Sequence, residues 1–179
     1  MSYPDPARPD VTTVRIRQGG GAPPLVTAAP EALTHTTFAG AEGWFTYEQW
    51  GTYPPADGSE YRLYRSARRP EAPPPGCVVL VSVRFDGPDE ARLRAWVDLV
   101  FEALADSDPH PGGLGAHFHL SADGTRVANY AEWTSEAAHL DALGSTGVVG
   151  SSPKFALVQA FPGVAGSTVR RFRPVSGIR

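Results

Sequence analysis

One short stretch of this sequence gathers the side chains best suited to chemistry. The segment GLGAHFHLSADGTRVANYAEW, residues 113–133, contains His117, His119, Asn129 and Trp133. A histidine exchanges protons near neutral pH, because its ordinary pKa is about 6.5. An asparagine amide and a tryptophan indole donate hydrogen bonds. These residue types are therefore suited to proton transfer and to hydrogen bonding of a ligand.

The spacing of these residues predicts a β-hairpin. Residues 117–121 and 125–133 form its two strands, and the Ala-Asp-Gly sequence at 122–124 is typical of a tight turn. Side chains alternate across a strand, so His117 and His119 share one face, while Asn129 and Trp133 share a face of the returning strand. If Asn129 faces inward it needs a partner, because an unpaired buried amide costs about 1–3 kcal/mol. That partner is either a neighbouring group or a ligand.

Composition excludes several other classes of site. The net charge of −3 gives no electrostatic basis for binding nucleic acid, and the arginines at 170, 171 and 173 are typical of a solvated strand or tail. Cys77 is the single cysteine, which excludes an intramolecular disulfide and a cysteine cluster for metal. The His117-x-His119 pair has no third ligand nearby, so we predict no metal. There is no apolar run typical of a signal peptide or a membrane span, and we expect a cytoplasmic protein.

The elements around the hairpin predict a ferredoxin-like βαββαβ module over residues 77–175. A β-prone run at 77–85 precedes a helix that begins near Pro88 and carries an apolar stripe including Trp96. After the hairpin, one short helix ends at Gly144, a second follows Pro153, and a strand closes the module. This order is typical of an α+β fold with an antiparallel sheet and helices on one face.

The first half of the sequence resembles the second. The segment FAGAEGWFTYEQW, residues 38–50, resembles residues 119–133 when a two-residue gap is allowed, so that Tyr47 matches Tyr130 and Trp50 matches Trp133. We interpret residues 11–70 as a degenerate copy of the module; chance similarity between two hairpins is the alternative. Residues 1–10 are expected to be a disordered arm, and residues 71–76 a proline-rich linker.

The hairpin and the helix after it resemble the antibiotic biosynthesis monooxygenase family, most closely the anthrone oxygenases of aromatic polyketide pathways. The shared pattern is S-x-DG followed by NYAxW, and the FPGV sequence at 161–164 resembles the C-terminal segment of the family. The resemblance implies a dimeric α+β barrel, in which two ferredoxin-like sheets close face to face. An internally duplicated chain would supply both sheets as a pseudo-dimer. A further homodimer is possible.

The resemblance also implies roles for three residues of the hairpin. The catalytic asparagine of the family corresponds to Asn129, its histidine to His119 and its tryptophan to Trp133. Asn129 would donate a hydrogen bond to an enolate-like oxygen, Trp133 would donate another or form an apolar wall, and His119 would exchange the proton. Asn129 could instead pair only with backbone, and Trp133 could simply pack in the core.

Elsewhere the sequence departs from the family pattern. A tyrosine of the family is replaced by His139, and a pocket arginine has no match, because Phe155 stands at its position with Lys154 alongside. We expect the substrate to contact four residues: His117, His139, Trp96 and Phe155.

The function implied is a cofactor-independent monooxygenase that oxidises an aromatic polyketide, turning an anthrone-type ring into a quinone. Its co-substrate would be O₂, and no flavin, haem or metal would be needed. Two alternatives remain open. The protein could be a flavin-assisted oxygenase that cleaves or rearranges polyketide rings, or a non-oxidative cyclase or polyketide-binding subunit.

Overall fold

The computed structural model describes residues 3–25, 28–144 and 152–175. The helices and strands follow one another in this order: β1 (Thr13–Gly19), β2 (Thr34–Gly40), β3 (Gly43–Trp50), β4 (Glu60–Arg68), β5 (Cys77–Phe85), α1 (Glu90–Ala105), β6 (Gly113–Ser121), β7 (Arg126–Trp133), α2 (Glu136–Gly144), α3 (Lys154–Gln159) and β8 (Val164–Pro174). None of the helices in these described ranges is long and apolar enough to span a membrane.

The eight strands form one closed barrel, in the order β1-β3-β2-β8-β5-β7-β6-β4. Each half of the chain supplies four consecutive strands in the same arrangement, with its fourth strand beside its first, then its third and its second. The halves join where β2 pairs with β8 and where β4 pairs with β6, both antiparallel. The predicted α+β barrel with a ferredoxin-like module is therefore confirmed, and one chain closes it.

Inward-facing side chains of both halves share the core of the barrel. Alternation along the strands turns one set of residues inside, where buried side chains of both halves meet. Phe38 stacks on Phe45 with ring centroids 4.4 Å apart, and Tyr47 lies 5.1 Å from Tyr130. Tyr47 and Tyr130 are the pair that the sequence repeat matched, and they meet across the interior.

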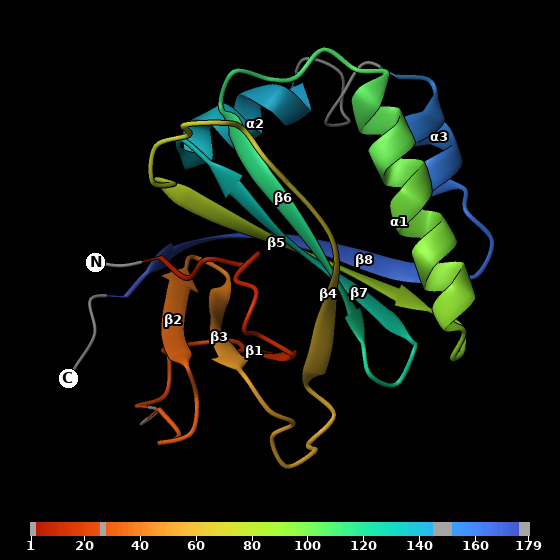
Figure 1. Cartoon of the computed structure of the whole chain (residues 1–179). Helices are drawn as coiled ribbons and strands as arrows, with labels where there is room; N and C mark the ends of the chain where they lie inside the picture. Colours follow the sequence, from red (N-terminus) through yellow and green to blue (C-terminus); the bar gives the residue numbers. More distant parts are fainter. Residues whose placement is uncertain (1–2, 26–27, 145–151, 176–179) are drawn as a thin grey trace.

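All the helices of the described chain lie in the second half, outside the sheet β5–β8 (Figure 1). Leu93, Val97 and Val100 of α1 are buried against this outer face. The helix begins at Glu90, two residues later than predicted, because Asp89 is its N-cap and accepts a hydrogen bond from the Arg92 N–H at 3.0 Å. The described part of the first half has strands but no helix, which agrees with its Gly- and Pro-rich connections.

The prediction of a disordered arm is wrong for residues 3–10. Tyr3 packs against Phe38, and the side chain of Gln49 donates a hydrogen bond to the Asp5 carbonyl at 2.6 Å. The segment is proline-rich but still covers one end of the barrel, because its aromatic ring and backbone find partners there. Residues 1 and 2 lie outside the described residues. The proline-rich linker is a short connection from β4 to β5, and Arg68 donates hydrogen bonds to the carbonyls of Ala72 and Pro73.

Candidate functional site

A cavity of about 540 Å³ lies between the outer face of the β5–β8 sheet and the helices. Small-molecule sites commonly have volumes of about 300–1,000 Å³. Strands supply its floor and helices its walls, and most of its lining is apolar. Its lining includes Val79, Val81, Trp96, His110, Phe118, Asn129, Ala131, Trp133, His139 and Phe155.

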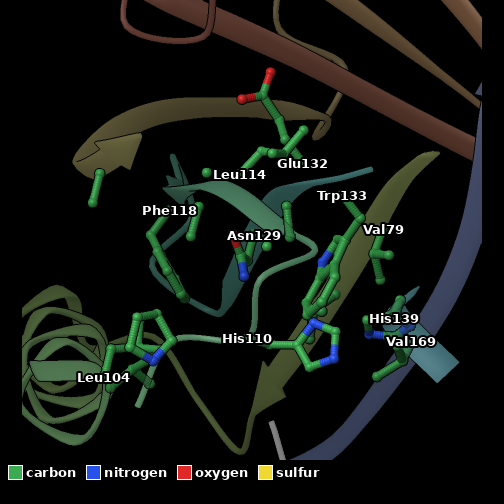
Figure 2. Close-up of a pocket in the computed structure, with 18 of the residues that line it drawn as sticks. Val79, Leu104, His110, Leu114, Phe118, Asn129, Glu132, Trp133, His139 and Val169 are labelled. Atoms are coloured by element: carbon green, nitrogen blue, oxygen red, sulfur yellow. The ribbon is translucent and has the colours of Figure 1, made fainter. Parts of the chain in front are cut away.

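Asn129 stands in the middle of the floor of this cavity. The strand register pairs it with Val81 on one side and with Phe118 on the other. Its Oδ1 accepts a hydrogen bond from the backbone N–H of His117 at 3.2 Å. This contact fixes which way the amide points, and Figure 2 shows the Asn129 nitrogen turned into the cavity. The backbone thus satisfies the oxygen, while the Nδ2 donor is presented to whatever occupies the cavity.

Trp133 forms one side of the cavity, beside two histidines (Figure 2). It is only 6% exposed, and it contacts the ring of His139 edge-on at a centroid distance of 4.9 Å. The centroid of the His110 ring lies 5.7 Å from the indole. The indole therefore serves both as a wall of the cavity and as the support that positions two imidazoles.

His139 lines the cavity from α2, as predicted, and a hydrogen bond from Arg171 determines which ring nitrogen carries its proton. The residue is 3% exposed, and its Nδ1 accepts a hydrogen bond from Arg171 Nε at 2.9 Å. Burial, helped by the Arg171 charge, lowers the pKa of His139 to about 4. At neutral pH the ring is therefore uncharged and carries its proton on Nε2.

His110 also lines the cavity, and the sequence analysis missed it. It lies in the connection between α1 and β6, where its Nδ1 accepts from the Gly112 N–H at 3.0 Å and its Nε2 lies 3.1 Å from Asp141. A loop histidine beside proline and glycine follows no strand or helix period. The one signal was its position directly before the hairpin that carries Asn129.

The structure does not place His119 in the cavity, so its prediction as the residue that exchanges the substrate proton is wrong. Its side chain is fully buried inside the barrel, on the opposite face of β6. Nδ1 lies 3.3 Å from the Ala128 carbonyl, so it carries the proton, and Nε2 accepts from the Tyr47 hydroxyl at 2.9 Å. Burial, with a smaller effect of His117, lowers the pKa of His119 to about 3.

His117 also faces the barrel, which contradicts its predicted contact with the substrate. The side chain is 1% exposed, with Nδ1 2.7 Å from the Ser66 hydroxyl and Nε2 3.6 Å from Glu132. Glu132 is held in turn by Arg68 at 2.6 Å. Only the backbone N–H of His117 serves the cavity, through Asn129. Alternation across β6 was predicted correctly, but the face that the histidines occupy is the inner one.

The other predicted contacts line the cavity. Trp96 and Phe155 are both lining residues, from α1 and α3. The indole N–H of Trp96 donates to the Val158 carbonyl at 3.1 Å and so joins the two helices. Lys154, beside Phe155, forms ion pairs with Glu102 and Asp106 and is not a lining residue.

The corresponding face of the first half is filled by a buried ion-pair cluster. Arg15 lies beside Glu48 on the outer face of β1 and β3, where Val79 and Ala131 lie in the second half. Both charged residues are less than 7% exposed, and the Arg15 guanidinium lies 5.1 Å from the Trp50 ring centroid. Burial opposes ionisation of Glu48, but His35 and the arginines outweigh it and lower its pKa. Charged side chains thus occupy the position that the cavity has in the second half.

We therefore expect one ligand per chain. Titration with 1,8-dihydroxyanthraquinone, an aromatic ligand of the class implied by the hairpin, should saturate at one molecule per chain in isothermal calorimetry. Ala131→Phe places a ring in the floor of the cavity and should abolish this binding, because the ring takes up the space that the ligand would fill. Saturation at two molecules, or undiminished binding by Ala131→Phe, would contradict this placement.

Comparison with known proteins gives matches to both the sequence and the fold. Residues 78–149 match the family model for antibiotic biosynthesis monooxygenase. Over 68 residues the chain is 43% identical to the tetracenomycin-F1 monooxygenase of Streptomyces glaucescens, a match that covers 37% of this chain and 58% of that protein. The chain therefore spans little more than half the length of this curated relative.

Two solved structures resemble nearly the whole chain. An anthrone oxidase-like protein matches 94% of this chain and 93% of its own, with a TM-score of 0.65 and 13% identity. A ferredoxin-fold protein of Listeria monocytogenes, described as related to antibiotic biosynthesis monooxygenases, matches 93% and 96%, with a TM-score of 0.60 and 13% identity. At such identity these likenesses establish the fold alone, and they extend to both halves of the barrel.

Proposed function

Since residues 78–149 of this chain match the family model for antibiotic biosynthesis monooxygenase, we propose that the protein is an oxygenase that oxidises an aromatic polyketide. The reaction proposed is conversion of an anthrone-type ring to a quinone with O₂, without flavin, haem or metal. The observation that carries the proposal is the Asn129 amide, which points a hydrogen-bond donor into an otherwise largely apolar cavity.

This arrangement suits the charge that develops in the reaction. When an anthrone loses a proton from its CH₂ carbon, the negative charge is shared with the carbonyl oxygen on the opposite side of the central ring. A donor fixed in advance stabilises that oxygen without having to reorganise, and the effect is strong where water is excluded. Asn129 is held by its contact to His117, so its Nδ2 meets this condition. Trp96, Phe118 and Phe155 provide apolar walls for flat rings.

The oxidation then balances with O₂ alone. The carbanion gives one electron to O₂, and the resulting carbon radical and superoxide combine to form a C–O bond. The peroxide takes up a proton, its O–O bond breaks as the carbon loses its remaining hydrogen as a proton, and water leaves. The CH₂ group becomes C=O, one oxygen atom of O₂ enters the product, and the other leaves as water.

The protein offers no free base for the first proton among the described residues that line the cavity. The Nδ1 atoms of His110 and His139 both already accept hydrogen bonds, and His110 Nε2 is paired with Asp141, so neither ring offers a free lone pair to the substrate. Glu132 is paired with Arg68, and Figure 2 shows its carboxylate directed away from Asn129. The proton is therefore lost to solvent water before or on binding, and the chain contributes binding, orientation and oxyanion stabilisation.

Oxygen uptake tests this proposal. Protein stripped of metal and flavin is mixed with 1,8-dihydroxyanthrone in an oxygen electrode, and heat-denatured protein corrects for spontaneous oxidation. We expect protein-dependent uptake of one O₂ per quinone formed. Uptake that requires added reduced flavin would instead support a flavin-assisted oxygenase. Tight binding without any uptake would support a cyclase or binding subunit.

A further inference from the structure

We propose that the cavity takes its substrate as an anion, an ionised phenol or enolate, and that Arg171 fixes His139 as an N–H donor for the anionic oxygen. The inference deepens the proposed function, on which the identity of the substrate rests. It concerns two residues of this chain that act together: His139 on α2 faces the cavity, and Arg171 on β8 lies behind it.

Arg171 determines which nitrogen of His139 carries the proton. A guanidinium has donors and no acceptor, so the Arg171 Nε–H at 2.9 Å from His139 Nδ1 requires a lone pair on that atom. The ring proton is then on Nε2. A second proton is disfavoured, because burial and the Arg171 charge both lower the pKa of His139. His139 is therefore an N–H donor with a fixed tautomer.

The charges around His139 also favour an anion. From β8 it faces the Arg171 cation and from β7 the Trp133 ring; His110, in the loop before β6, contacts the same indole and is paired with Asp141. Cys77 is buried in the same layer on β5, and burial raises the pKa of its thiol, so it stays neutral.

Glu132 and Asp141, two acidic groups of this region, each have a partner. Burial opposes ionisation of Glu132, but hydrogen bonds from His117 and Arg68 outweigh it and lower its pKa. Its charge is thus paired with Arg68. Asp141, on the same helix as His139, lies 3.1 Å from His110 and is largely exposed to solvent. The Arg171 cation behind His139 and the donor of Asn129 that points into the cavity remain to favour an anion.

These features define a substrate class. With no free base among the described lining residues, the substrate has to lose its proton to water before or on binding. An isolated phenol has a pKa near 10 and is neutral at pH 7. The cavity therefore suits more acidic phenols, in which a carbonyl group conjugated with the ring shares the charge. The anion is also the form that gives an electron to O₂, so selecting it would commit the bound substrate to oxidation.

The test uses alizarin (1,2-dihydroxyanthraquinone), a dye whose visible spectrum changes when its phenol ionises. The apparent pKa of the dye is measured free and bound to the full-length protein. We expect the bound pKa to be lower by about one unit or more, which corresponds to about tenfold tighter binding of the anion.

Variants of His139 and Arg171 test whether these two residues cause the shift. His139→Phe keeps a ring but loses the donor, and should remove most of the shift. His139→Gln offers an amide N–H and should recover part of it. Arg171→Gln should also reduce the shift, whereas Arg173→Gln, which removes an exposed arginine two residues along the same strand, should leave it unchanged. Thermal unfolding checks that each variant is folded. If Arg171→Gln does not fold, the two His139 variants are sufficient for the test.

An unchanged or raised pKa of the bound dye would overturn the inference, as would failure of the wild-type protein to bind it at millimolar concentration. Equal shifts in the wild type and His139→Phe would also overturn it. The readout needs no turnover, so it is separate from the test of oxygenase activity. A lowered dye pKa without oxygen uptake would remove the proposed function alone, and uptake without the shift would remove this inference alone.

Discussion

Replacing Asn129 with alanine is expected to lower turnover of an anthrone by about 100- to 1,000-fold, because one donor to a developing oxyanion contributes about 2.7–4 kcal/mol. Its Nδ2 faces the cavity while its Oδ1 is held by the His117 N–H. Binding of the neutral quinone should weaken much less, since the donor gains strength only where charge builds on the oxygen. Steady-state oxygen uptake gives turnover, and calorimetry with the quinone gives binding.

Asn129→Asp is the matched control for this prediction. A carboxylate can still accept from the His117 N–H, so the local backbone contact is kept, but the donor that faces the cavity becomes an acceptor. Turnover should fall at least as far as in the alanine variant. If either variant is folded, as judged by its unfolding midpoint, and retains wild-type turnover, Asn129 has no role in stabilising the oxyanion.

The second large effect concerns stability in acid, and it arises from His119. The pKa of this buried ring is lowered from 6.5 to about 3, chiefly by burial. Between these pH values the unfolded chain binds a proton that the folded protein does not, so the free energy of unfolding falls as the pH falls. The contribution of His119 to the free energy of unfolding is present in full above pH 6.5 and is lost progressively toward pH 3. The loss should be of the order of a few kcal/mol.

Urea unfolding between pH 8 and pH 4 measures this contribution. His119→Gln removes the titrating group, so its stability should depend less steeply on pH than that of the wild type. His139, whose pKa is lowered to about 4, acts in the same direction, so the His119→Gln, His139→Gln double variant should have a shallower dependence still. Wild-type steepness in His119→Gln would show that the imidazole is protonated in the folded protein, contrary to its burial against Tyr47 and Ala128.

The fold was largely predictable because its local signals agree with one another. The hairpin at 113–133 has alternating side chains and a turn at Gly124, whose φ of +69° favours glycine. The strong apolar run at 77–85 and the amphipathic helix after it became β5 and α1. The packing of residues 3–10 was not predictable, because it depends on a contact between Tyr3 and Phe38 that no local pattern encodes.

The site was predicted only in part. Alternation placed Asn129 and Trp133 on one face, and they do share the cavity. The same rule placed His117 and His119 together, but it cannot tell which face of a sheet in a closed barrel lies inside. His110 and Arg171 come from a loop and a distant strand, and they meet Trp133 and His139 only through the tertiary fold.

A crystal structure of the protein with bound 1,8-dihydroxyanthraquinone, the oxidised and unreactive product of the proposed reaction, tests the central claim most directly. We predict one molecule between the outer face of the β5–β8 sheet and α1, with an oxygen atom within hydrogen-bonding distance of Asn129 Nδ2 and its rings against Trp133. A ligand inside the barrel beside His119, or on the charged outer face of β1 and β3, would contradict this assignment of the site.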